Sequence, residues 1–134
     1  MRKIKKLISE DKIASFFNTK GWSPLPFQID AWESFSKGEN GLIQVPTGCG
    51  KTYAALMGPL KKLQDLNVPK GINILFITPL KALSRDLKKS ISEAAKFIDK
   101  EITISIRNGD TSPYEKRKQL LNPPNILITT PESL

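Results

Sequence analysis

Histidine is absent from this chain of 134 residues, and cysteine occurs once, at Cys49. Without imidazole, Ser-His-Asp and Cys-His catalysis and every His-ligated metal site are excluded. A single cysteine cannot form an internal disulfide, which excludes a disulfide scaffold and favours a reducing compartment, so we expect a cytoplasmic protein. No apolar run approaches the roughly 20 residues of a membrane helix, and no membrane partner is expected.

Acidic side chains are also scarce, because 13 Asp and Glu stand against 21 Lys and Arg, a formal net charge of +8. This balance suits a polyanionic partner, nucleic acid first, although Lys-rich surfaces also serve solubility. Hydrophobic residues make up 39% and charged residues 25% of the chain. Both fractions are ordinary for a globular domain, and the length allows one domain with a core.

Apolar strand-like segments alternate with helical patterns along most of the chain. We expect strands at 42–45, 72–77, 102–106 and 126–129, and helices at 51–66, 80–99 and 113–121. Four such alternations with short connections predict an α/β fold with a parallel sheet of about four strands and helices on both faces. The strand at 72–77 is expected to be fully buried, because it is apolar on both faces. Gly58-Pro59 is expected to kink or shorten the helix at 51–66.

Local signals add four helix boundaries and one buried face. Ser9 is a cap for a helix at about 10–20 that stops at Gly21, and a second helix ends at Gly38. The Ser112 to Glu115 segment reads as a capping box with Pro at the first helical position. The helix at 80–99 is expected to turn one set of apolar residues inward: Leu83, Leu87, Ile91, Ala94, Ala95 and Ile98.

The most informative segment is the Gly-rich loop Val45-Pro46-Thr47-Gly48-Cys49-Gly50-Lys51-Thr52, which follows an expected strand and opens an expected helix. This context is the one that a phosphate-binding P-loop requires. Gly48 and Gly50 allow positive φ and let backbone N–H groups approach a phosphate. Lys51 is placed to stabilise the β- and γ-phosphates, and Thr52 offers a hydroxyl to Mg²⁺. The strict pattern has Gly where Val45 stands.

With this loop, the chain resembles the first motor domain of superfamily 2 helicases, the DExD/H-box group with a RecA-like core. Pro46 to Thr52 is similar to helicase motif I, and Pro24 to Gln28 is similar to the Q motif. The resemblance implies that ATP and Mg²⁺ are bound by Gln28, Thr47, Gly48, Cys49, Gly50, Lys51 and Thr52. Gln28 would pair with adenine, whose N6 and N7 complement an amide. Trp22, Phe16 or Phe17 would stack on the base or pack in the core.

Three later segments resemble nucleic-acid motifs of the same group. Thr78 to Leu83 is similar to motif Ia, Arg107 to Thr111 to motif Ib, and Thr129 to Leu134 to motif Ic. In the family these segments line the groove for a nucleic-acid strand, and the residues implied here are Pro79, Lys81, Arg85, Gly109, Asp110, Thr130, Pro131 and Glu132. Helix N-termini and hydroxyls behind strand ends are suited to phosphates. Solvated surface is an equal alternative for Lys81 and Arg85.

Within the superfamily, the chain is most similar to the Lhr-type group. Gly21 to Pro24, Pro79 to Leu83, Gly109 to Thr111, Pro123-Pro124 and Thr130 to Leu134 carry this resemblance. The Trp22 to Gln28 segment is similar to ligase-associated DEXH-box helicases. The resemblance implies a partner that is single-stranded or duplex DNA, with an RNA/DNA hybrid also possible.

The sequence contains no Asp-Glu dipeptide, so it has no DEXH box. We therefore expect residues 1–134 to be a truncated first RecA-like domain, with N-terminal helices at 1–40 and a P-loop core at 41–134. The second RecA-like domain, with its arginine finger, would be missing too, and such a finger is worth about 10³ to 10⁵ in rate. We expect nucleotide binding without useful ATP hydrolysis, so no catalytic set is complete beyond phosphate stabilisation by Lys51.

Two other classes remain open at this point. A P-loop kinase or GTPase explains Lys51 and Thr52 equally well, but it does not explain Gln28 or the Thr130 to Ser133 segment. A nucleotide-independent nucleic-acid-binding module explains the net charge of +8. Selectivity for ATP and ADP over GTP and GDP would favour the helicase over a kinase or GTPase. DNA binding that survives Lys51→Ala would favour the nucleic-acid-binding module over the helicase.

Overall fold

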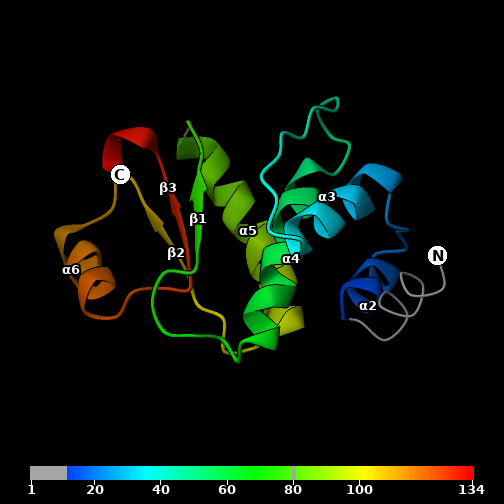
Figure 1. Ribbon diagram of the computed structural model, residues 1–134. Helices are drawn as coiled ribbons and strands as arrows, with labels where there is room; N and C mark the ends of the chain where they lie inside the picture. The colour runs from blue at the N-terminus through cyan, green and yellow to red at the C-terminus, as the bar shows by residue number, and fades with distance from the viewer. Residues whose placement is uncertain (1–11, 80) are drawn as a thin grey trace. The chain divides into compact units, whose positions relative to one another are not determined.

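The computed structural model describes residues 12–79 and 81–134, without the side chains of residues 81 and 82. The chain, drawn in Figure 1, divides into two compact units, Met1–Lys62 and Leu63–Leu134. The cap expected at Ser9 lies outside the described residues.

The first unit is helical in its described part. Its helices are α2 (Lys12–Thr19), α3 (Pro26–Ser36) and the start of α4 (Lys51–Asp65). In α2, the spacing of Ile13, Phe16 and Phe17 places all three on one face, and all three are buried. Gly38 has a φ of 77° directly after α3, which confirms the expected stop, because such a conformation is easy for glycine.

The helix α4 is not shortened at Gly58-Pro59, contrary to the expectation from sequence. It runs without a break from Lys51 to Asp65 with Pro59 inside it. Its neighbours Leu56, Met57 and Leu60 are fully buried. Burial of such side chains contributes about 1.5–3 kcal/mol each, which outweighs the ~3 kcal/mol cost of an internal proline.

The segment expected to form the first strand, 42–45, has no regular structure, so the described sheet has three strands where about four were predicted. Leu42 is 88% exposed. Four apolar residues become a strand only when another strand offers hydrogen bonds at its edge, and within the described residues none pairs with this segment. The apolar pattern at 42–45 is typical of a strand, but it does not indicate which strand would pair with it.

The second unit is a three-stranded parallel sheet with helices between its strands. Its elements are β1 (Ile74–Ile77), α5 (Lys81–Ile98), β2 (Ile104–Arg107), α6 (Pro113–Leu121), β3 (Ile126–Thr129) and the 3-10 turn η1 (Pro131–Ser133). The strand order is β1-β3-β2, with Ile74 and Ile104 both paired to Ile126. The two crossovers run in opposite directions along the sheet, so right-handed connections put α5 and α6 on opposite sides of it, as Figure 1 shows.

Burial in this unit centres on β3 and α5. Ile126 and Ile128 are fully buried in the central strand, and α5 buries Ile91, Ala94, Ala95 and Ile98. Leu83, also expected inward, is 49% exposed. The reason is length: an 18-residue helix is about 27 Å long, whereas four-residue strands span about 13 Å, so the helix extends past the sheet.

The strand β1 is not fully buried, which corrects a second expectation. Its residues alternate between half-buried and exposed, and Leu75 and Ile77 are 48% and 51% exposed. An apolar strand is buried on both faces only when a layer covers each of them. In the described part of the chain, the face with Leu75 and Ile77 is left accessible.

The buried amide of Asn125 ties three segments together at the start of β3. Its Oδ1 accepts from the Thr103 N–H at 3.0 Å and from the Thr103 hydroxyl at 3.1 Å. Its Nδ2 donates to the Pro69 carbonyl at 2.8 Å, and its own N–H donates to the Thr103 hydroxyl at 3.0 Å. The Asn125 side chain therefore links the segments that precede β1 and β2 to the start of β3.

The N-terminus of α6 gives a first testable prediction. Ser112 has extended backbone, and its hydroxyl accepts from the Glu115 N–H at 3.1 Å, as the sequence predicted. We expect Ser112→Ala to lower the free energy of unfolding by about 1 kcal/mol, because one helix N–H loses its acceptor. Urea unfolding followed by far-UV circular dichroism measures the loss. Ser112→Asp keeps an acceptor, and an equal loss in that variant would argue against the cap.

Candidate nucleotide and nucleic-acid sites

The Gly-rich loop of the first unit has the backbone shape that a phosphate cradle needs. Gly48 and Gly50 have φ values of 84° and 87°, which residues with a Cβ rarely adopt. Lys51 is exposed and begins α4, and Thr52 is half-buried in its first turn. Thr47 and Cys49 complete the loop, exposed and half-buried respectively. The loop therefore lies at the N-terminus of a 15-residue helix, where N–H groups and the helix dipole favour an anion.

Gln28 connects the start of α3 to this loop. Its side chain is 3% exposed. Its Oε1 accepts from the Leu25 N–H at 2.8 Å, and its Nε2 donates to the Gly50 carbonyl at 3.0 Å. The amide thus caps its own helix and holds the P-loop, and one N–H of the amide remains for another acceptor. The predicted pairing with adenine stays a prediction, and the second lone pair of Oε1 is available for it beside the Leu25 contact.

Aromatic rings pack around the first turn of α4. Rings lie 5.6–6.2 Å apart, centroid to centroid, in a cluster of Phe16, Phe17, Trp22, Trp32 and Tyr53. Of the three candidates for base stacking, Phe16 and Phe17 are core residues, 1% and 2% exposed, whereas Trp22 is 44% exposed. Sequence reasoning missed that the Trp32 indole donates to the Tyr53 carbonyl at 2.9 Å. Trp32 and Tyr53 are 21 residues apart, so no local sequence pattern indicates this hydrogen bond.

In the second unit, the loop after β2 is shaped by its own polar groups. The Asn108 N–H donates to the Thr111 hydroxyl at 2.9 Å, and the Asn108 carboxamide accepts from the Asp110 N–H at 2.9 Å. Asn108 is 9% exposed, whereas Gly109 and Asp110 are exposed. The sequence placed Asn108 inside the motif Ib segment without giving it a role, although Asn is a frequent turn-forming residue.

The end of β3 is built in a similar way. The Thr129 hydroxyl donates to the Arg107 carbonyl at 2.7 Å and so joins the ends of β3 and β2. Thr130 is 2% exposed and precedes η1, whose Pro131 and Glu132 are exposed. Of the predicted nucleic-acid residues here, Pro131 and Glu132 are therefore accessible and Thr130 is not.

The remaining predicted nucleic-acid residues follow β1. Pro79 is exposed, and Arg85 is an exposed residue of α5. Lys81 begins α5, and its side chain lies outside the described residues. Because the three strands are parallel, the segments after them meet at one edge of the sheet, the edge where parallel α/β folds bind ligands.

The DEAD/DEAH box helicase family model matches residues 25–134. The chain belongs to this helicase family. It is 40% identical over 91% of its length to the "ATP-dependent helicase Lhr-Core" of Sulfolobus acidocaldarius, and 36% identical over 83% to the "Lhr helicase/uracil glycosylase" of Escherichia coli. The chain spans 15% and 8% of these relatives.

Solved structures agree with this family. The Mycobacterium smegmatis helicase Lhr, bound to single-stranded DNA and AMP-PNP, superimposes with a TM-score of 0.80 at 39% identity, over 89% of this chain and 16% of that one. The RecA-like helicase fold and the resemblance to Lhr helicases are thereby confirmed. Similarity to ligase-associated helicases stays a prediction. In the described part of this helicase chain, no helix is both long and apolar enough to span a membrane.

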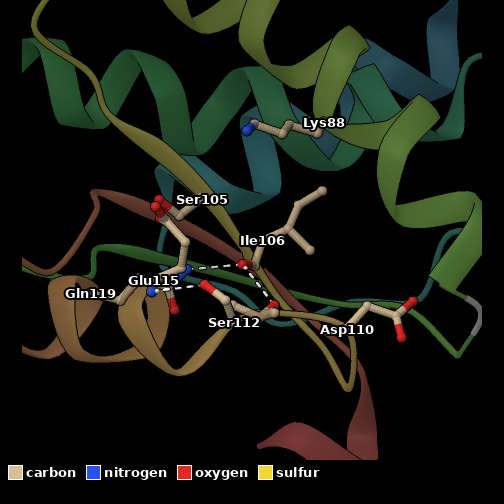
Figure 2. A pocket seen from close by; sticks show the side chains of 8 residues that line it. Lys88, Ser105, Ile106, Asp110, Ser112, Glu115 and Gln119 are labelled. Atoms are coloured by element: carbon tan, nitrogen blue, oxygen red, sulfur yellow. Dashed lines mark hydrogen bonds between the residues drawn. The ribbon is translucent and has the colours of Figure 1, made fainter.

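A cavity of about 390 Å³ lies beside β2 (Figure 2). It is lined by Lys88, Ser105, Ile106, Asp110, Thr111, Ser112, Glu115 and Gln119. The Gln119 Nε2 donates to the Ile106 carbonyl at 2.9 Å, and the Gln119 Oε1 is buried without a hydrogen bond. Among the predicted nucleic-acid residues whose side chains the structure describes, Asp110 alone lines this cavity, so the cavity is distinct from most of the strand-end surface.

Proposed function

We propose that this chain is an ATP- and nucleic-acid-binding part of an ATP-dependent DNA helicase. The observation that carries the proposal is the P-loop: two glycines at positive φ, then Lys51 and Thr52 in the first turn of α4. A triphosphate would lie over the loop N–H groups, with Lys51 compensating the charge of its outer phosphates.

Mg²⁺ is proposed to bind at Thr52 together with the nucleotide. No cluster of three or more Cys, Asp or Glu side chains among residues 12–79 and 81–134 is arranged to hold a metal ion by itself. A hydroxyl in the first turn of α4 suits Mg²⁺, which keeps several waters and shares its other ligands with phosphates. The ion would bridge two phosphates and neutralise part of their charge.

The strand-end edge of the second unit is proposed to hold the phosphates of single-stranded DNA. Arg85, Gly109, Asp110, Pro131 and Glu132 are exposed along or near this edge, and the net charge of +8 favours a polyanion. Duplex DNA or an RNA/DNA hybrid would use the same backbone contacts. ATP hydrolysis and strand separation would require a DEXH box and a second RecA-like domain. The 134 residues contain no Asp-Glu dipeptide, and so no DEXH box. We also propose a cytoplasmic location, because a single cysteine is typical of proteins in a reducing compartment.

A nucleotide titration tests this proposal. The purified chain is titrated with a fluorescent ADP analogue and Mg²⁺, beside Lys51→Ala. We expect saturable binding that weakens about tenfold in Lys51→Ala, because one charge-assisted contact to phosphate is lost. Unlabelled ADP should compete and GDP should not, if the Gln28 amide reads adenine.

Two outcomes would favour the other classes. Equal competition by ADP and GDP would contradict adenine reading and favour a different P-loop protein. Salt-sensitive binding of a thymidine oligonucleotide that is indifferent to nucleotide and to Lys51→Ala would favour a nucleic-acid module with an unused loop. Lys61→Ala, a charge removed ten residues further along α4, is the matched control for the titration.

A further inference from the structure

Unlike α5, the helix α6 buries none of its nine residues. Tyr114, Leu120 and Leu121 are 73%, 72% and 73% exposed. The helix is attached through its Ser112 cap and through Gln119, which donates to the Ile106 carbonyl of β2. Large apolar side chains that are concentrated on an exposed helix are typical of an interaction surface.

Four exposed side chains form a line on the outer face of α6. Tyr114, Arg117, Lys118 and Leu121 have the spacing i, i+3, i+4 and i+7, which places them on one side of a helix. At about 100° per residue, Gln119 lies about 150° away from the middle of this line. Because Gln119 faces β2, the line faces away from the sheet. We call these four residues the α6 stripe.

The α6 stripe has apolar groups at its ends and two cations at its centre. Arg117 and Lys118 have no ion pair within the described part of the chain. The complement of this pattern is a helix with two carboxylates between two apolar residues at the same spacing. We propose that the α6 stripe docks an acidic amphipathic helix of a partner protein.

A protein partner fits this surface better than nucleic acid. Tyr114 and Leu121 offer apolar area at the two ends of the stripe, which a phosphate backbone cannot cover. The helix also begins at Ser112, beside the strand-end edge, and runs back toward the start of β3, so that Leu121 lies about 13 Å along the helix from that edge. The proposal is therefore independent of the proposed nucleotide and DNA sites.

A synthetic peptide tests the docking. The probe is a fluorescein-labelled 18-residue helix with the repeat Leu-x-x-Glu-Glu-x-x-Leu, and its anisotropy is followed as the full chain is added. We expect saturable binding with a Kd below about 1 mM, weakened at least about fivefold by Tyr114→Ala or Leu121→Ala. The double reversal Arg117→Glu with Lys118→Glu should abolish binding. A peptide with Lys in place of Glu should restore it, because the charges are then exchanged between the partners.

Matched variants elsewhere in the second unit serve as controls. Lys70→Glu with Lys100→Glu makes the same change of charge at exposed sites, and Leu66→Ala removes an exposed leucine. Circular dichroism verifies folding of each variant. The proposal is overturned if the peptide does not bind, if the controls lose as much binding as the stripe variants, or if the exchanged charges do not rescue. It is also overturned if Arg117 and Lys118 are needed for a thymidine oligonucleotide while Leu121→Ala leaves peptide binding unchanged.

Discussion

Gly50→Ala should both weaken nucleotide binding strongly and destabilise the first unit. A Cβ at this position would lie 2.5 Å from the Gln28 Nε2, and the backbone has a φ of 87°. Backbone strain and overpacking cost about 1–3 kcal/mol each, so we expect a loss of about 3 kcal/mol in the free energy of unfolding. Nucleotide affinity should fall about a hundredfold, about 2.7 kcal/mol, because the Gln28 amide must move away from the Gly50 carbonyl and the loop backbone must change its conformation.

Gly48→Ala separates the two causes of this effect. Gly48 has nearly the same φ, 84°, but a Cβ there meets nothing within 4 Å. It should cost only the backbone strain, about 1 kcal/mol. Both tryptophans lie in the first unit, so urea unfolding followed by tryptophan fluorescence reports on that unit. Gln28→Ala combined with Gly50→Ala should recover part of the stability, and full additivity of the two losses would contradict the clash.

Asn125→Ala should destabilise the second unit by about 3 kcal/mol. The substitution removes the hydrogen bonds of the Asn125 amide to the Pro69 carbonyl, the Thr103 N–H and the Thr103 hydroxyl, and each contributes about 0.5–1.5 kcal/mol. Urea unfolding by circular dichroism measures the loss, and hydrogen exchange should speed up most in β2 and β3.

An exposed asparagine on the same connection provides the comparison. Asn122 follows α6 and is exposed. We expect Asn122→Ala to stay within about 0.5 kcal/mol of the wild type. A similar small effect for Asn125→Ala would mean that water replaces the amide, and that the three segments are held by backbone bonds alone.

Local patterns predicted the elements of the second unit closely. The strand at 126–129 was predicted with its observed bounds, and the helix expected at 113–121 also formed there. Such elements are determined by caps, prolines and apolar runs within a few residues. The prediction of a strand at 42–45 was wrong, because a strand needs a pairing partner that its own residues do not specify. Pro59 did not shorten α4, because burial of its neighbours outweighed a local propensity.

The candidate sites show the same division. The motif predicted the P-loop backbone, since glycines at fixed spacing lead to positive φ at Gly48 and Gly50. Sequence also named Gln28, but not its bond to Gly50, which joins residues 22 positions apart. The sequence placed Asn108 and Thr129 in the motif Ib and motif Ic segments but did not predict their contacts, because the amide and the hydroxyl act on backbone groups.

The hydrogen bond from Gln119 to Ile106 has a consequence for how the sheet can be extended. Thr103 and Arg107 turn their carbonyls toward β3, so the intervening Ile106 carbonyl points to the opposite, outer edge of β2, and Gln119 occupies it. That border cannot readily recruit another strand. The other border, beside β1, has no strand next to it among the described residues. Growth of this sheet is therefore one-directional, and any strand that completes it adds beside β1.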